Sequence, residues 1–205
     1  MSETDLHTAY FPGQQKLAPV LMLHGTGGDE SDLLPLATFL LPQHPTFGIR
    51  GRITEGAGAR RYFIRNRDGS FDLTNISQEA DWLWQSVATV ADEYLLDPQR
   101  LIVLGFSNGA NIAAYSLLHK QPPFKTAILL HPMLIEEQPT LPDLNGVAVF
   151  ASFGDLDPIV KESNFDQLIT ALKTAGADVT VFKNHQSHRP SQAELAAAKQ
   201  WLSVN

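Results

Sequence analysis

The sequence predicts an α/β fold: a mostly parallel central sheet with helices on both of its faces. Short apolar runs alternate along the chain with longer segments whose apolar residues recur at helical spacing. A strand that is apolar throughout is buried on both faces, as in parallel sheets covered by helices. The chain has 205 residues, 43% of them hydrophobic, and neither a repeat nor a linker divides it. We therefore expect one domain over residues 1–205.

Six runs are predicted to be strands because they are short, apolar and followed by glycine or polar residues. In chain order they are residues 20–24 (VLMLH), 46–52, 101–105 (LIVLG), 126–130 (TAILL), 147–153 (VAVFASF) and 179–182 (VTVF). In open parallel sheets, reactive groups gather beyond the carboxyl ends of the strands. The residues that follow these runs are therefore the first place to look for chemistry.

Five segments between these strands are predicted to be helices: residues 32–41, 76–96, 108–119, 165–175 and 191–202. The fourth is ended by Gly176. The last begins at Ser191, with Glu194 three residues later, which is the pattern of a capping box.

Composition and charge narrow the function classes. A formal net charge of −7 does not favour phosphate neutralisation, so we expect no nucleic-acid partner and no polybasic membrane anchor. The absence of cysteine excludes disulfides, thiolate metal sites and cysteine nucleophiles. Residues 1–5 are acidic rather than apolar, and no run is long enough to span a bilayer. We expect a cytoplasmic protein that does not bind membranes.

A serine follows the third predicted strand in the pattern G-x-S-x-G. Residues 105–109 read GFSNG, and a helical segment follows directly. This strand–turn–helix setting holds Ser107 on a sharp turn with its hydroxyl clear of the sheet, while Gly105 and Gly109 let neighbouring backbone pass close by. The pattern favours Ser107 as a nucleophile. The alternative is a turn serine that caps the next helix.

A serine hydroxyl needs a base, and the chain order Ser–Asp–His places the base after the last strand. His185 and His188 both follow that strand, and spacing alone does not separate them. The acid is expected after the preceding strand, where Asp155 and Asp157 both suit the position. One of the two aspartates is expected to be structural.

The glycine-rich residues 24–29 (HGTGGD) follow the first predicted strand. Such a loop can aim a backbone N–H at a developing negative charge, with the N–H of Asn108 as the second donor of an oxyanion hole. A phosphate-binding loop is the alternative, but neither phosphate-loop pattern is complete and the acidic residues after the glycines would repel phosphate. His24 is interpreted as a packing residue. No suitably spaced pair supports a metal site, and we expect no cofactor.

These motifs resemble the phospholipase/carboxylesterase family of α/β-hydrolases, which includes small bacterial carboxylesterases and acyl-protein thioesterases. The resemblance extends from about residue 20 to residue 202 and includes residues 23–30 (LHGTGGDE), 32–36 (DLLPL) and 105–109 (GFSNG). The family's acid motif, G-x-x-D-x-x-V, is filled at residues 154–160, which favours Asp157. The family's spacing from base to helical glutamate favours His188, with Ser187 standing where glycine is usual.

The resemblance also implies the surroundings of the site. It implies an α/β-hydrolase fold, and an oxyanion hole built from the N–H groups of Thr26 and Asn108. Residues 50–72 are implied to form part of the pocket wall. Arg60 and Arg61 could meet an acidic group of a substrate, although exposure on the surface is the favoured interpretation for both. Ordinary packing is an equal alternative for each of four candidate pocket residues: Phe63, Phe71, Met133 and Leu134.

The sequence therefore predicts a serine carboxylesterase that acts through an acyl-enzyme intermediate. The connection at residues 131–146 is short and contains three prolines, so we expect no large lid and a preference for short-chain esters. A thioesterase or lysophospholipase with the same triad is one alternative, and a non-catalytic binding protein is another. The expected partner is a small-molecule ester. By analogy with the family, a homodimer is also expected.

Overall fold

The computed structural model describes residues 6–204, so the acidic stretch at residues 1–5 lies outside it. A seven-stranded sheet has the order β1-β3-β2-β6-β7-β8-β9, and β1 alone pairs antiparallel within it. Its strands are β1 (Thr8–Phe11), β2 (Val20–Leu23), β3 (Thr46–Ile49), β6 (Ile102–Phe106), β7 (Thr126–Leu130), β8 (Ala148–Gly154) and β9 (Asp178–Asn184). The predicted mostly parallel sheet is confirmed.

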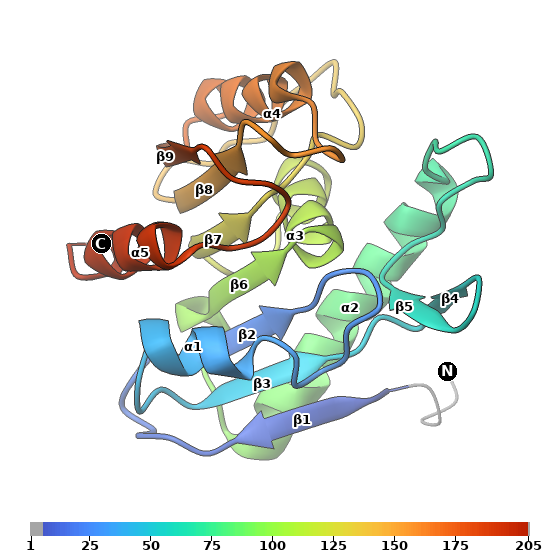
Figure 1. Ribbon diagram of the computed structural model, residues 1–205. Coiled ribbons are helices and arrows are strands. Elements are labelled where there is room, and N and C mark those ends of the chain that lie inside the picture. The colour runs from blue at the N-terminus through green and yellow to red at the C-terminus, as the bar shows by residue number, and fades with distance from the viewer. Residues whose placement is uncertain (1–5, 205) are drawn as a thin grey trace.

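Helices cover both faces of this sheet (Figure 1). One face carries α1 (Leu34–Leu40) and α5 (Gln192–Leu202), and the other carries α2 (Leu73–Tyr94), α3 (Asn108–His119) and α4 (Glu162–Thr174). Alternate strand residues enter two cores, so Leu104 packs with α1 and α5 while Val103 packs on the opposite side. Two-sided burial explains why the central strands are apolar throughout.

The starts of α2 and α5 follow their capping side chains. The Asp72 carboxylate accepts a hydrogen bond from Asn75 N at 2.9 Å, and α2 therefore begins three residues before the predicted position 76. The predicted capping box of α5 is confirmed: Ser191 Oγ accepts from Glu194 N, and Glu194 Oε2 accepts from Ser191 N.

Three short strands were not predicted. The edge strand β1 is half-buried along its length, and the hairpin strands β4 (Ile53–Glu55) and β5 (Ala59–Arg61) have three residues each. The strand expected over residues 46–52 ends at Ile49, because the chain leaves the sheet there to form this hairpin. The hairpin stands apart from the main sheet near the carboxyl ends of its strands (Figure 1).

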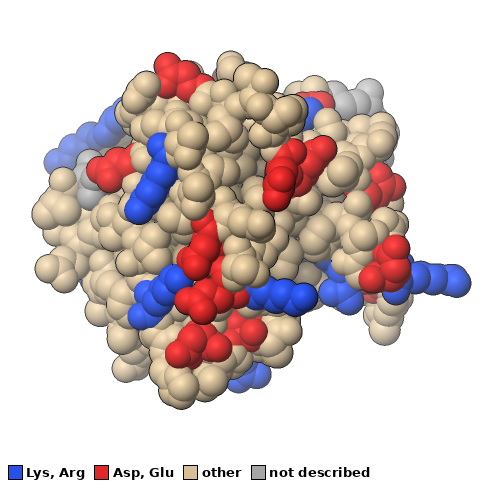
Figure 2. Space-filling view, turned by 90° about the horizontal axis from the view of Figure 1, so that it is seen from above, with Lys and Arg blue, Asp and Glu red and all other residues tan. Residues whose placement is uncertain are grey.

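The outer surface carries charges of both signs. Figure 2 shows that acidic side chains form a band across the face on the side of α4, with Lys and Arg beside them. Lys183 of β9 forms ion pairs with Glu162 and Asp166 of α4 at 2.9 and 2.8 Å. Among residues 6–204, no helix has the length and apolar character needed to cross a bilayer.

Candidate active site

Ser107 occupies a strained turn between β6 and α3, with φ 50° and ψ −114°. This region of backbone space is costly for a residue with a side chain, and such strain is often found at active sites. The flanking glycines are required sterically. A Cβ on Gly109 would lie 2.0 Å from the carbonyl oxygen of Leu23, and a Cβ on Gly105 would lie 2.8 Å from Ala110 N. The turn thus brings α3 directly against β2.

The Ser107 hydroxyl makes no capping bond to α3 and instead lies 2.7 Å from His188 Nε2. His188 Nδ1 lies 2.6 Å from Asp157 Oδ2. The three side chains come from the turns after β6, β9 and β8, at the carboxyl edge of the sheet. Because ionised Asp157 can only accept, His188 Nδ1 carries a proton and Nε2 is free to accept the proton of Ser107.

Asp157 is held as a carboxylate. Its side chain has no exposed surface, and burial opposes ionisation. Hydrogen bonds from Val160 N, His188 Nδ1 and Ile159 N outweigh burial and keep the pKa of Asp157 below its usual value. The Val160 of the G-x-x-D-x-x-V motif therefore contributes its backbone N–H to this carboxylate.

The two residues that spacing left as alternatives pair with each other away from the site. His185 Nδ1 lies 2.9 Å from Asp155 Oδ1, and their side chains are 77% and 52% exposed. Neither residue contacts Ser107. The structure therefore brings Ser107, Asp157 and His188 together and leaves His185 and Asp155 on the surface.

The loop after β2 lies beside the Ser107 turn. The N–H of Gly27 donates to Arg60 O at 2.8 Å and that of Gly28 to Gly25 O at 3.1 Å, so both are already committed. Thr26, between Gly25 and Gly27, lines the same cleft as Ser107 and Asn108. Asn108 is the first helical residue of α3, where a backbone N–H has no partner within the helix.

His24 lies buried beneath this loop. Its Nδ1 donates to Gly25 O at 2.6 Å, and its Nε2 accepts from Gly51 N at 3.0 Å. Burial lowers the pKa of His24 despite the Gly25 hydrogen bond, which fits a neutral ring with this pattern. His24 therefore fastens the loop to the segment that leads into the hairpin.

Sequence and structure comparisons agree on the family. The model of the family "Phospholipase/Carboxylesterase" matches residues 62–205. MhqD of Bacillus subtilis strain 168, a protein named as a hydrolase, is 36% identical over 89% of this chain and 90% of its own. The chain belongs to the phospholipase/carboxylesterase family. It is a carboxylic ester hydrolase by that membership.

Solved structures of similar sequence extend this family assignment over the whole fold. The Bacillus cereus carboxylesterase is 33% identical, covers 99% of this chain and 96% of its own, and superposes with a TM-score of 0.94. The structure of YahD with malic acid is 36% identical, covers 97% of this chain and 98% of its own, and has a TM-score of 0.93. The α/β-hydrolase fold is thereby confirmed.

In this family member a cleft of about 790 Å³ opens above Ser107. The β4–β5 hairpin and the following turn form one wall, and the loops after β7 and β8 form the other. Phe71 and Met133 line the cleft, as the resemblance implied. Phe63 does not line it: its ring is fully buried behind Phe71, edge-on at 5.3 Å. Leu134 faces a separate groove beside α4.

Side-chain amides of α3 anchor both walls of the cleft. Asn108 Oδ1 accepts from Tyr62 N at 2.8 Å, which ties the hairpin segment to the Ser107 turn. Asn111 Oδ1 accepts from Met133 N at 2.9 Å, which ties the loop after β7 to the same helix. Both sides of the cleft are therefore anchored within four residues of Ser107.

The cleft wall is rich in arginine. Arg61, Arg65 and Arg189 line it together with a single acidic residue, Glu55. The expectation that Arg61 lies on the surface is wrong, because Arg61 is buried and forms an ion pair with Glu55. Its Nε lacks a partner in the described structure. Arg60 instead donates to Thr54 on the exposed side of the hairpin and lies outside the cleft lining.

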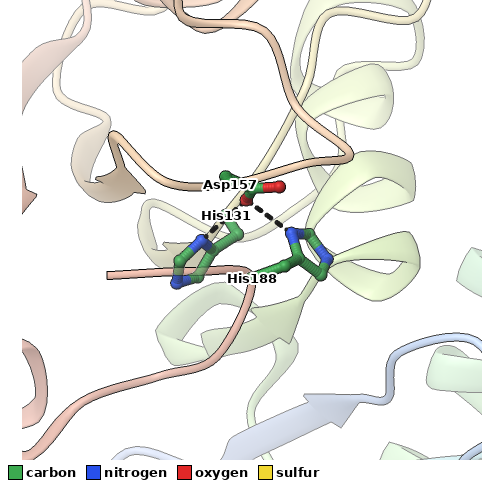
Figure 3. A group of neighbouring side chains, drawn as sticks. All are labelled: His131, Asp157 and His188. Carbon is green, nitrogen blue, oxygen red and sulfur yellow. Dashed lines mark hydrogen bonds and ion pairs between the residues drawn. The ribbon is translucent and has the colours of Figure 1, made fainter. Parts of the chain in front are cut away.

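His131 is a site residue that the sequence reasoning missed. It follows β7 directly, is fully buried, and places Nδ1 3.1 Å from Asp157 Oδ2 (Figure 3). His131, Asp157 and His188 present ligand-type atoms within 4.8 Å of one another. Both imidazoles, however, point at the same carboxylate oxygen at hydrogen-bond distance, so hydrogen bonding accounts for the cluster. The sequence could have marked His131 as a candidate site residue, because it stands at the carboxyl end of a strand.

Proposed function

We propose that this hydrolase cleaves carboxylic esters with Ser107 as nucleophile, His188 as general base and Asp157 as the partner of the base. The observation that carries the proposal is the continuous contact from Ser107 Oγ to His188 Nε2 at 2.7 Å and from His188 Nδ1 to Asp157 Oδ2 at 2.6 Å. The name of the similar Bacillus cereus carboxylesterase supports the ester as the bond cleaved.

The proposed cycle has two halves. His188 Nε2 takes the Ser107 proton as Oγ bonds to the ester carbonyl carbon, and the backbone N–H groups of Thr26 and Asn108 stabilise the oxyanion. The alkoxy C–O bond then breaks, and the leaving alcohol receives that proton from His188. Water adds to the acyl-enzyme with His188 again as base, which releases the acid and restores Ser107. Asp157 stabilises the transient imidazolium.

A short acyl chain fits this cleft best. The connection from β7 to β8 contains no helix in the described structure, so no helical lid closes over Ser107. The larger apolar side chains that line the cleft are Phe71, Phe106, Met133, Ile159 and Val160. We expect acetate to butyrate esters to be turned over faster than long-chain esters, because a long chain would extend into water.

The arginines of the wall favour a substrate that carries a carboxylate. Arg61, Arg65 and Arg189 against Glu55 give this cleft a formal charge of +2 in a chain whose net charge is −7. The similar structure of YahD contains malic acid, a dicarboxylic acid, which is consistent with such a preference. We expect half-esters of small dicarboxylic acids to be accepted.

The test is hydrolysis of p-nitrophenyl esters from acetate to dodecanoate by the wild type and by Ser107→Ala. Loss of about 10⁶-fold in kcat is expected for Ser107→Ala. Near-full turnover by that variant would overturn the nucleophile assignment. Thioester or lysophospholipid turnover that exceeds short-ester turnover would instead favour those activities. Absence of turnover in the wild type for every substrate class would favour a binding protein.

A further inference from the structure

Behind the triad acid lies a second buried histidine between two carboxylates. His131 has no exposed surface; its Nδ1 lies 3.1 Å from Asp157 Oδ2, and its Nε2 lies 3.6 Å from Glu194 Oε1. The triad histidine, His188, reaches the same Asp157 oxygen from the other side (Figure 3). One carboxylate oxygen thus serves two imidazoles.

Glu194 is more than a helix cap. Its Oε2 accepts from Ser191 N at 3.0 Å, which completes the capping box, while its Oε1 accepts from Ser152 Oγ and faces His131. The side chain is 1% exposed, and a buried carboxylate is stabilised both by hydrogen bonds and by a nearby positive charge. His131 is the group placed to provide that charge.

The backbone shows that this arrangement is maintained at a cost. His131 has a φ of 53°, which is unfavourable for a residue with a side chain and tolerated best by glycine and asparagine. Hydrogen bonds from His131 N to Ser152 O and Oγ, at 3.2 and 3.3 Å, hold it in this conformation. Its imidazole consequently projects into the space between β7, β8 and α5.

The charged groups that face the His131 ring are Asp157 from the loop after β8, Glu194 from α5 and His188 from the loop before α5. Burial disfavours a charged imidazole, but Glu194 and Asp157 outweigh it and raise the pKa of His131. With His131 protonated, the three groups behind His188 sum to −1: two carboxylates and one imidazolium. Without that proton they sum to −2.

We propose that His131 and Glu194 form a buried counter-charge pair that sets the net charge behind Asp157, and thereby the pH at which His188 becomes a base. His131 is a positioning residue, since it touches Asp157 and not the substrate. This proposal rests on the proposed function, because it concerns the base of that mechanism. The direction of the effect follows from the charges. The ring centroids of His131 and His188 lie 5.2 Å apart, so a positive charge on His131 opposes protonation of His188.

The test compares pH profiles of kcat/KM in the wild type, His131→Asn and His131→Asn/Glu194→Gln. Asparagine tolerates the positive φ and can still donate to Asp157, so the geometry is retained while the charge is removed. Glutamine at position 194 keeps the capping box. The single variant makes the cluster −2, and the double variant restores −1.

We expect the acid limb of the profile to move up by on the order of 1 to 2 pH units in His131→Asn, from the interaction of unit charges at about 5 Å. On the acid side of the limb this lowers kcat/KM by roughly 10-fold or more. The double variant is expected to return the limb close to its wild-type position. A limb that stays in place in His131→Asn, or that Glu194→Gln does not restore, would overturn the proposal.

Two observations keep this test separate from the proposed function. If Ser107→Ala abolishes ester turnover while the limb of His131→Asn does not move, only the counter-charge proposal fails. The wild type also gives a reading that needs no variant. Nitrogen NMR of ¹⁵N-histidine is expected to show that one of the seven histidines titrates above the usual histidine pKa of about 6.5. A spectrum in which none of the seven does so would contradict the proposal.

Discussion

The close approach of α3 to β2 makes Gly109→Ala a sharp test of how the nucleophile is placed. The added Cβ would lie 2.0 Å from Leu23 O and 2.7 Å from His24 O, both backbone atoms that cannot rotate away. Restoring a normal contact requires α3 to move by more than about 1 Å relative to the sheet. Ser107 stands two residues before this contact, so the same movement displaces its hydroxyl from His188.

Two opposing effects set the size of the expected change in the free energy of unfolding. Overpacking a buried contact costs about 1–3 kcal/mol, while alanine is favoured over glycine in a helix by about 1 kcal/mol. We therefore expect Gly109→Ala to lower the free energy of unfolding by up to about 2 kcal/mol. A 1 Å misplacement of a catalytic group lowers the rate by about 10²-fold, so kcat/KM is expected to fall by that factor.

The matched control is Ala113→Gly in the same helix. Ala113 is fully buried in α3, and its replacement costs about 1 kcal/mol in helix propensity and about 0.8 kcal/mol for the lost methyl group, without pushing on β2. Urea unfolding and ester kinetics on both variants separate stability from geometry. The reasoning is refuted if Gly109→Ala retains wild-type kcat/KM, or if Ala113→Gly loses as much activity as Gly109→Ala.

Three further predictions concern the acid, the excluded histidine and the cleft wall. Because the pKa of Asp157 in the folded protein lies below the usual aspartate value of about 3.9, its stabilising effect is present above about pH 4 and is lost as the pH falls through the folded pKa. The difference in unfolding free energy between wild type and Asp157→Asn should therefore shrink towards about pH 3, and a pH-independent difference would contradict this. His185→Asn should change kcat/KM less than about twofold and stability by less than about 0.5 kcal/mol, since the residue is exposed; a large loss of activity would count against the assignment of His188. Arg65→Gln should lower kcat/KM for monomethyl succinate by about 2- to 5-fold with little effect on methyl butyrate, because Arg65 is exposed and its ion pair with the substrate carboxylate would be weak. Equal effects on both esters would argue against carboxylate recognition.

Periodicity was sufficient to predict the parallel sheet, because its strands are apolar on both faces and its helices are amphipathic. It was insufficient for the β4–β5 hairpin, whose strands of three residues are too short and too polar to show a pattern. That hairpin forms a wall of the cleft, so its shape could not be derived from local sequence. The edge strand β1 was not predicted for a related reason. All four of its residues are half-buried, so it shows no clear alternation of buried and exposed positions.

The site was predictable to the extent that its residues lie just beyond strand ends. Ser107, Asp157 and His188 all lie within four residues of the end of a strand, but family resemblance was needed to prefer Asp157 and His188 over Asp155 and His185. Their difference lies in long-range packing, which buries one pair and exposes the other. Phe63 shows the same limit, because burial behind another ring depends on residues distant in the chain. The position of His131 at a strand end could have been noticed, but its contact with Asp157 depends on long-range packing.

Labelling with a fluorophosphonate probe tests the central claim most directly, because only a serine activated by a base reacts. Mass spectrometry of the wild type should locate the probe on Ser107. Labelling should be lost in His188→Asn and retained at the wild-type rate in His185→Asn. Labelling of another residue, or unchanged labelling of His188→Asn, would contradict the account.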